Sequence, residues 1–224
     1  MALILNIDTS TETASVCLAR NGEPLLLEKN QKQNDHASWL HNAIKDMMEK
    51  VNINISAIDA VAVTIGPGSY TGLRVSLAAA KGICYALQKP LITLNTLSVM
   101  ANAIKNEKAD LLCPMIDARR LEVFTAVYSK SLDEIKKPKA LIIDEHSFNE
   151  ELKSGTICFS GSGSKKLKAL IENANAVFSE IEFSAINMTD MSERLFIQKE
   201  FAELAYTEPL YLKEFYSPAR KLEI

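Results

Sequence analysis

Two apolar segments that end alike constrain most strongly what this chain can fold into. Residues 2–8 and residues 111–117 are short apolar runs, and both close with the dipeptide Ile-Asp. Runs of this length that stop at an acid are typical of buried strands. Each is followed by a turn, by further strands, and later by a strand, a glycine-containing loop and a helix. The repetition predicts a duplicated α/β unit rather than a tandem repeat of the solenoid kind.

The first half of the chain has a β-β-β-α-β-α-β-α pattern. An Asn-Gly pair at residues 21 and 22 is a strong hairpin signal, so the second and third strands are expected to form an antiparallel ribbon. The first helix carries an apolar stripe at helical spacing, with Asp35 as its expected N-terminal cap. We expect strands at residues 2–8, 13–20, 24–29, 58–65 and 90–94, and helices at 35–51, 71–87 and 96–105.

The second half repeats this mixture of strands and helices after a polar segment at residues 106–110. That segment predicts a seam between an N-terminal lobe, residues 1–105, and a C-terminal lobe, residues 106–224. In this division the last helix is free to pack back on the first lobe. We expect strands at residues 111–117, 122–128, 140–143, 156–160, 176–178 and 210–213, and helices at 165–172 and about 191–205.

Composition excludes several classes of protein. The chain has 224 residues, of which 47% are hydrophobic and 24% charged, too apolar for a disordered polymer. No apolar run approaches the roughly 18 residues that a membrane span needs. The net charge of −3 gives no support for a protein that binds nucleic acid by itself, without a partner protein. Four scattered cysteines without a CxxC pair, and an N-terminus that lacks a basic region, predict a cytoplasmic protein.

Two polar segments could face a nucleotide. A strand ends at Asp8 and continues into hydroxyl residues, and a glycine loop at 66–69 opens the next helix, where free N–H groups could receive an anion. The loop is not a P-loop, because the GxxxxGK[ST] order is missing. Plain turns shaped for packing remain the alternative. The candidate phosphate-facing residues are Asp8, Thr9, Ser10, Gly66, Gly68 and Ser69.

The helix at residues 71–87 is apolar almost all round and crowded with small residues. A helix of this kind is buried on more than one face, so one side is expected to meet its own sheet and another to meet a partner helix. The preceding helix adds residue types favoured at adaptable interfaces. The alternative is that both helices cover the same core. The candidate partner residues are Trp39, Met47, Arg74, Ala78, Ala79 and Gly82.

No metal site or catalytic set follows from the spacing of the remaining candidates. His36 and His41 would point about 140° apart on a helix, so they cannot share a metal. A Gly-Ser-Gly-Ser-Lys segment at residues 161–165 could touch a phosphate, but such segments are more often simple turns. We therefore predict no catalytic residue and no metal ligand.

Four motifs together resemble the TsaB family, also called YeaZ, over nearly the whole chain. Residues 66–74 read GPGSYTGLR, similar to the family's GPGS[FY]TG[LV]R signature, and residues 7–10 read IDTS. Residues 117–124 read DARRLEVF, and residues 209–213 read PLYLK, where the family closes with P-x-Y-[LV]-R. Two positions depart from the pattern. Ser76 stands where glycine is usual, which bears on how closely a partner helix can approach, and Lys213 replaces arginine.

The resemblance implies an actin/hexokinase-like (ASKHA) fold of two related lobes, each a mixed sheet flanked by helices. It implies a non-catalytic subunit in the synthesis of N6-threonylcarbamoyladenosine (t6A) at position 37 of tRNA. Such a subunit dimerises with TsaD, acts together with the TsaE ATPase, meets tRNA through the complex, and forms a homodimer when alone. No intrinsic cofactor is implied, although ATP or ADP with Mg at the complex interface is compatible. The alternatives are an ATP-binding ASKHA-type enzyme and a metal-dependent glycoprotease-like peptidase.

Overall fold

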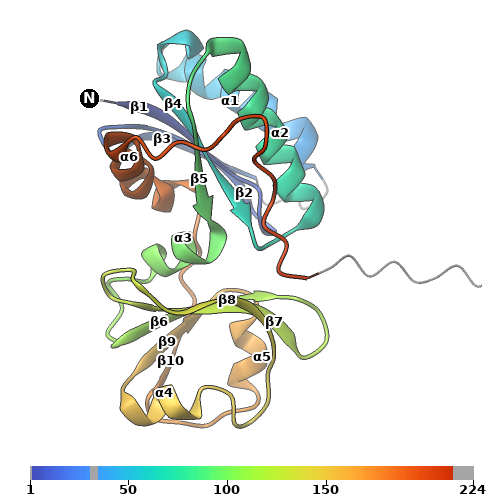
Figure 1. Cartoon of the computed structure of the whole chain (residues 1–224), viewed down its shortest axis with the longest axis vertical. Coiled ribbons are helices and arrows are strands. Elements are labelled where there is room, and N and C mark those ends of the chain that lie inside the picture. Colours follow the sequence, from blue (N-terminus) through green and yellow to red (C-terminus); the bar gives the residue numbers. More distant parts are fainter. Residues whose placement is uncertain (1, 31–34, 214–224) are drawn as a thin grey trace, which may run out of the picture.

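Two five-stranded sheets lie one beyond the other along the long axis of the molecule (Figure 1). The computed structural model describes residues 2–30 and 35–213. The first sheet has the order β3-β2-β1-β4-β5, and the second has the order β8-β7-β6-β9-β10. The strands are β1 (Leu3–Asp8), β2 (Ala14–Arg20), β3 (Glu23–Asn30), β4 (Ala60–Gly66), β5 (Leu91–Asn95), β6 (Leu111–Asp117), β7 (Glu122–Ser129), β8 (Glu134–Ile142), β9 (Ile157–Ser160) and β10 (Ala176–Ser179).

The two sheets share one plan. β1 pairs antiparallel with β2 and parallel with β4, and β6 pairs in the same way with β7 and β9. On the outer sides, β3 and β8 extend the antiparallel ribbons while β5 and β10 extend the parallel pairs. The predicted duplication is therefore confirmed at the level of strand order. Each Ile-Asp segment supplies the central strand of its sheet.

Helices cover both faces of the first sheet. α1 (His36–Lys50) and α2 (Tyr70–Leu87) pack on the face reached by Leu5 and Ile7 of β1. Ile4 points to the other face, where it joins the 3₁₀ helix η2 (Ala185–Met188) and α6 (Thr189–Gln198). Because both faces are covered, β1 is apolar along its length instead of alternating with polar residues.

One helix joins the two sheets. α3 (Thr96–Ala103) lies between them in Figure 1, with Val99 in the core of the first sheet and Met100 in the core of the second. The far face of the second sheet is covered by α4 (Asn149–Ser154) and α5 (Ser164–Lys168), which contribute Leu152 and Leu167 to its core.

Several predicted boundaries are wrong. β8 starts six residues before the predicted residue 140, because its first part is an exposed lysine-rich edge that carries no apolar signal. α6 ends at Gln198 instead of near 205, because Lys199 takes a left-handed conformation with φ 57°. α5 is shorter than the predicted 165–172. The Asp35 side chain caps no backbone N–H of α1 and accepts a hydrogen bond from Ser38 Oγ instead.

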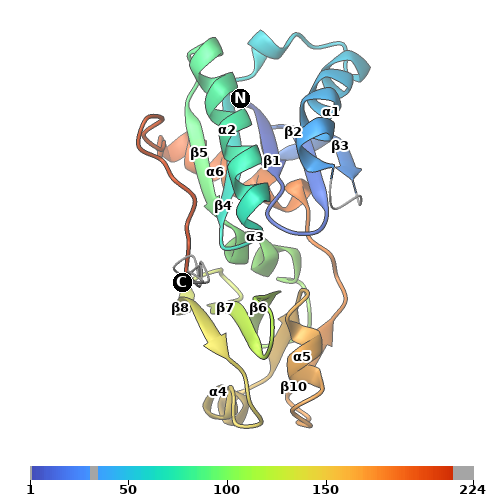
Figure 2. The ribbon, with the colours of Figure 1, turned by 90° about the vertical axis from the view of Figure 1, so that its right-hand side faces the viewer.

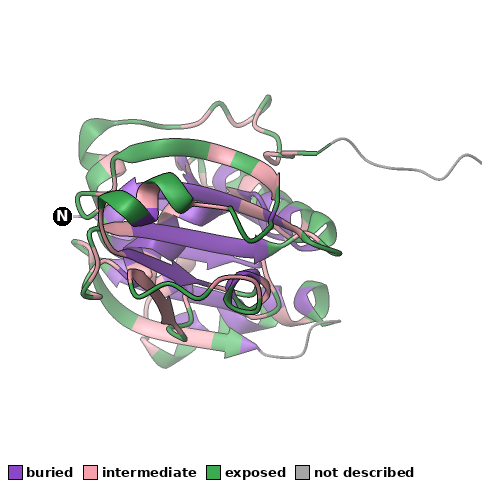
Figure 3. Cartoon of the chain, turned by 90° about the horizontal axis from the view of Figure 1, so that it is seen from below, coloured by how far each residue is buried: buried purple, intermediate pink, exposed green. Residues whose placement is uncertain are grey.

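The predicted strand at residues 210–213 is absent, since this stretch makes a single backbone bond to β4, from Leu210 N to Ile65 O at 2.7 Å. Figure 3 shows the central strands buried and the outer edges exposed. Among the described residues, no helix is both long enough and apolar enough to cross a membrane.

Candidate functional site

The end of β1 is a buried polar junction. Asp8 is 1% exposed, and its Oδ1 accepts hydrogen bonds from Ser10 Oγ and Thr64 Oγ1, both at 2.6 Å, and from Ser10 N at 3.2 Å. Asp8 Oδ2 has no partner among the described residues. Burial raises the pKa of Asp8, although these hydrogen bonds and the nearby His36 oppose the rise.

The glycine loop between β4 and α2 packs directly on this junction. Ser69 N donates to Ser10 O at 2.7 Å, and Thr9 Oγ1 donates to Gly72 O at 2.6 Å. A Cβ at Gly68 would lie 2.2 Å from Ser10 O, and one at Gly72 would lie 1.9 Å from Thr9 O. The two glycines therefore permit the close approach of two backbone segments.

The structure brings together most of the predicted phosphate-facing residues but uses their polar atoms internally. Asp8 and Thr9 are buried, and the hydroxyls of Thr9 and Ser10 donate within the junction. Ser10, Gly68 and Ser69 do line a cavity, and for them the interpretation stays a prediction.

Gly66 serves a different contact. Its φ of +124° is unfavourable for residues with a side chain, and a Cβ there would lie 2.5 Å from Leu210 O. Gly66 therefore makes room for the C-terminal part of the chain.

A cavity of about 610 Å³, here called the interlobe cavity, lies between the two lobes. His36 lines it and is 9% exposed as a residue. His36 Nε2 lies 3.3 Å from Thr11 O, and because a carbonyl oxygen only accepts, Nε2 carries a proton. Across the cavity, Arg119 sits in a left-handed turn with φ 72°. Asp117 holds that turn by accepting from Arg119 N at 2.6 Å and from Lys166 Nζ at 2.7 Å. Burial alone would raise the pKa of Asp117, but these hydrogen bonds outweigh it and lower the pKa below its ordinary value.

α2 presents an exposed face of small residues. Arg74, Ala78 and Gly82 are exposed on it, and a Cβ at Gly82 would meet no atom within 4 Å. Trp39 of α1 is half-buried against the core of the first sheet. We call the exposed side of α2 the docking face, defined by Thr71, Arg74, Ala78, Gly82, Tyr85 and Ala86.

Two of the predicted partner residues are wrong. Met47 is 0% exposed and Ala79 is 6% exposed, and both lie in the core between the helices and the first sheet. Ser76 is also fully buried, with its hydroxyl donating back to Gly72 O and Leu73 O at 3.3 Å, so it does not face an approaching helix. Apolar spacing predicted that these residues would be buried, but their own sheet rather than a partner buries them.

The C-terminal segment, residues 201–213, runs alongside α2 and is here called the strap (Figure 2). Lys81 Nζ donates to Ala205 O at 3.3 Å and to Thr207 O at 3.1 Å. Farther along, Arg74 Nε donates to Tyr211 OH at 2.9 Å, while the Arg74 guanidinium lies 4.0 Å from the centre of the Tyr70 ring. The sequence reasoning missed this clamp, although Tyr211 belongs to the closing motif that it singled out.

The strap also reaches the second lobe, because Lys213 Nζ pairs with the carboxylate of Glu122 on β7. Within the described part of the chain, no group of three or more His, Cys, Asp or Glu side chains could hold a metal ion. All four cysteines are free and buried.

Two lobes built on one mixed-sheet plan, joined through a central helix and enclosing a cavity, define an actin/hexokinase-like (ASKHA) fold. A Pseudomonas aeruginosa protein described as similar to peptidase YeaZ has this fold, with a TM-score of 0.85 and 24% identity over 95% of this chain and 100% of that one. An activator of 2-hydroxyisocaproyl-CoA dehydratase from Clostridium difficile also has it, with a TM-score of 0.50, 9% identity, and coverage of 90% and 98%.

The family follows from the sequence comparisons. Residues 28–219 match the family model described as TsaD, tRNA N6-adenosine threonylcarbamoyltransferase, and the chain belongs to this family. It is 27% identical to the Escherichia coli tRNA threonylcarbamoyladenosine biosynthesis protein TsaB, over 94% of both chains. It is 31% identical to the TsaB of Buchnera aphidicola from Baizongia pistaciae, over 63% of this chain and 65% of that protein. The predicted resemblance to TsaB is thus confirmed.

Proposed function

We propose that this protein is a non-catalytic subunit of the machinery that makes t6A in tRNA. It docks through α2 on a TsaD-type chain, and together with a TsaE-type ATPase it activates that chain. The observation that carries the proposal is the docking face on a chain that aligns with the Escherichia coli TsaB over 94% of both chains. A small-residue helical face lets another helix approach closely, and a related chain of the matching family is the partner that the comparisons favour.

The buried polar junction supports an accessory rather than a catalytic role. The hydroxyls of Thr9 and Ser10 are not free, because they donate to Gly72 O of α2 and to Asp8 Oδ1, and of the Asp8 carboxylate only Oδ2 is left without a partner among the described residues. Contact with tRNA then passes through the assembled complex, as does any use of ATP or ADP with Mg. Without the partner we expect a homodimer through the same face, because exposed apolar surface favours association.

The test is a reconstituted t6A assay. The cognate TsaD and TsaE proteins, tRNA and threonylcarbamoyl-AMP are combined with and without this chain, and t6A is measured in the digested tRNA. Product formation should depend on the chain. Equal yields without it would refute the proposal.

Two variants connect the activity to the docking face. Ala78→Trp places a bulky ring on the exposed side of α2 and should reduce both the complex on gel filtration and the t6A yield. Ala174→Trp is a matched control, because Ala174 is an exposed alanine in the second lobe, away from α2. If the two variants behave alike, α2 is not the interface.

A second candidate function is ATP binding in the interlobe cavity, favoured by its volume and by the solved Clostridium activator, which was determined with bound ADPNP. Calorimetry of the isolated protein with Mg-ATP separates the two. Tight binding and turnover by this chain alone would favour the enzyme.

A further inference from the structure

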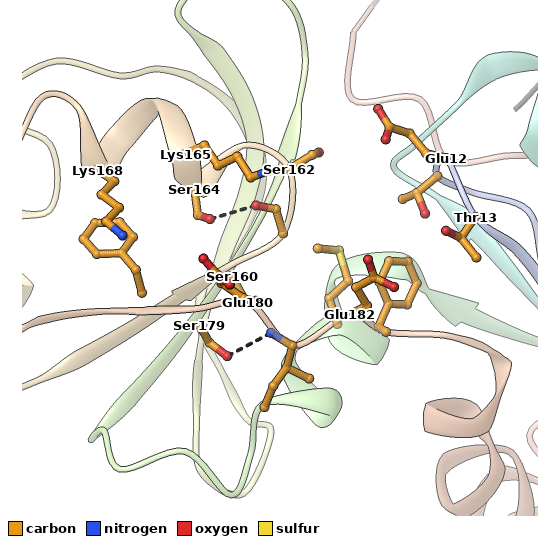
Figure 4. Close-up of a pocket in the computed structure, with 16 residues that line it drawn as sticks. Glu12, Thr13, Ser160, Ser162, Ser164, Lys165, Lys168, Ser179, Glu180 and Glu182 are labelled. Carbon is orange, nitrogen blue, oxygen red and sulfur yellow. Dashed lines mark hydrogen bonds between the residues drawn. The ribbon is translucent and has the colours of Figure 1, made fainter. Parts of the chain in front are cut away.

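A second cavity, of about 420 Å³, is here called the α5 cavity (Figure 4). It shares Thr11, Glu12 and Ser162 with the interlobe cavity. It is formed where α5 and the end of β10 face the first lobe. The docking face does not contribute to it. Its polar and charged lining residues are Thr11, Glu12, Thr13, Ser160, Ser162, Ser164, Lys165, Lys168, Ser179, Glu180 and Glu182.

The charges around the α5 cavity are of both signs and sit on different walls. Lys165 and Lys168 come from α5, and Glu12 comes from the β1–β2 turn on the opposite side, as Figure 4 shows. Glu180 and Glu182 come from the chain that leaves β10. No ion pair within the described residues involves any of these five side chains. All five side chains are exposed to solvent and border a space large enough for a small ligand. Lys168 Nζ also lies 5.8 Å from the centre of the Phe178 ring.

Lys166 differs from Lys165 and Lys168 in having an ion-pair partner among the described residues. Lys166 lies between the two cavity lysines on the same helix, but it does not line the cavity. It is neutralised by Asp117, whose Oδ1 lies 2.7 Å from Lys166 Nζ. Lys166 is therefore an internal control for Lys165 and Lys168.

A hydroxyl without a partner among the described residues also lines the α5 cavity. Ser160, at the end of β9, is 2% exposed and lines the α5 cavity, yet its hydroxyl makes no hydrogen bond to any described residue. The serines around it are all engaged. Ser162 Oγ accepts from Asp117 N at 3.0 Å, Ser164 Oγ donates to Gly161 O at 2.8 Å, and Ser179 Oγ accepts from Ile181 N at 3.2 Å. The Ser160 hydroxyl is therefore free to form a hydrogen bond with a molecule bound in the cavity.

The rest of the lining is apolar. Met100, Phe178, Ile181 and Phe183 supply it, and they come from both lobes and the connection between them. A ligand with an apolar side chain can bury that group there while its polar groups reach the charged walls.

The net charge of the walls selects the kind of ligand. Two lysines and three glutamates leave a formal charge of −1, so a polyphosphate would meet three carboxylates and a polyamine would meet two ammonium groups. A zwitterion satisfies both walls. We propose that the α5 cavity binds a free α-amino acid with an apolar side chain, its carboxylate on Lys165, Lys168 and Ser160 and its ammonium on the glutamates. This site is independent of the t6A role and is tested on the isolated chain.

The experiment is a titration of the isolated full-length protein with L-leucine and L-methionine, followed by NMR of the backbone amides. Shifts should saturate at millimolar concentration and centre on residues 160–168. N-acetyl-leucine lacks the ammonium group and leucinamide lacks the carboxylate, so both should bind about tenfold more weakly.

Variants of the α5 lysines test whether they hold the carboxylate of the amino acid. Lys165→Gln with Lys168→Gln should weaken leucine binding about tenfold and leave leucinamide unaffected, whereas the control Lys166→Gln should leave both unchanged. No saturable shift with any amino acid would overturn the proposal. So would equal binding of N-acetyl-leucine, or a response to ATP or spermidine at the same residues instead.

Discussion

Two glycines of α2 should respond in opposite directions to the same substitution. At Gly72 a methyl group would lie 1.9 Å from Thr9 O, more than an ångström inside any tolerated contact, whereas at Gly82 it would meet nothing within 4 Å. Gly82→Ala removes backbone entropy from an exposed helix interior and should stabilise the protein by about 0.8–1 kcal/mol. Gly72→Ala forces α2 away from the end of β1, and we expect an overpacking cost of about 1–3 kcal/mol.

The cost at Gly72 also includes a hydrogen bond. Thr9 Oγ1 donates to Gly72 O at 2.6 Å, and a helix displaced by an ångström loses that bond, worth about 1 kcal/mol. The buried hydroxyl of Thr9 would then have no partner in the junction. The two variants should therefore differ in the free energy of unfolding by about 3–5 kcal/mol.

Urea denaturation followed by circular dichroism measures this difference directly. The slope of the transition should stay the same, because the surface exposed on unfolding is unchanged, while the midpoint moves down for Gly72→Ala and up for Gly82→Ala. A Gly72→Ala protein as stable as the wild type would refute the reasoning, because the loop and the β1 end would then not be in backbone contact. A destabilised Gly82→Ala protein would show that its face is not open.

Two further predictions concern buried groups. Burial raises the pKa of Asp8 above its ordinary 3.8, so the folded chain holds this proton more tightly, and stability is lost as the pH rises from about 3.8 through the raised pKa. Asp8→Asn should lack that loss of stability, and urea midpoints of both proteins at pH 4 and pH 7 test it. If the difference in midpoint between the wild type and Asp8→Asn were the same at both pH values, the predicted direction of the pKa shift would be wrong. Burial also raises thiol pKa values to about 11 or 12, so a disulfide reagent at pH 8 should label native protein slowly and unfolded protein fully, at Cys17, Cys84, Cys113 and Cys158. Rapid labelling of the native protein would contradict this.

Local chemistry made most of the fold predictable. The Asn-Gly pair forms the turn between β2 and β3, where Asn21 and Gly22 both have positive φ, and the two Ile-Asp runs became the central strands. In contrast, the N-terminal part of β8 was not predicted, since an exposed edge strand rich in lysine has no apolar period.

The sequence predicted which glycines and hydroxyl residues of the candidate site lie close together, but not what their polar atoms contact. Glycines and hydroxyls suggested a phosphate, and the structure does bring them together, but the contacts of Thr9 and Gly72 show a packed junction. A glycine that approaches an anion and one that approaches a carbonyl look the same in sequence. The two cavities were not predicted, because they are formed by segments more than a hundred residues apart.

The sequence by itself determined that the chain repeats one α/β unit and that α2 carries more apolar and small surface than one sheet requires. Only the tertiary structure decided which of these residues is free. Met47 and Ala79 are buried by the chain's own first sheet, while Ala78, one position from Ala79, faces outward. The reason is geometric: periodicity shows that a helix has an apolar side, but its rotation on the sheet decides which residues that sheet covers.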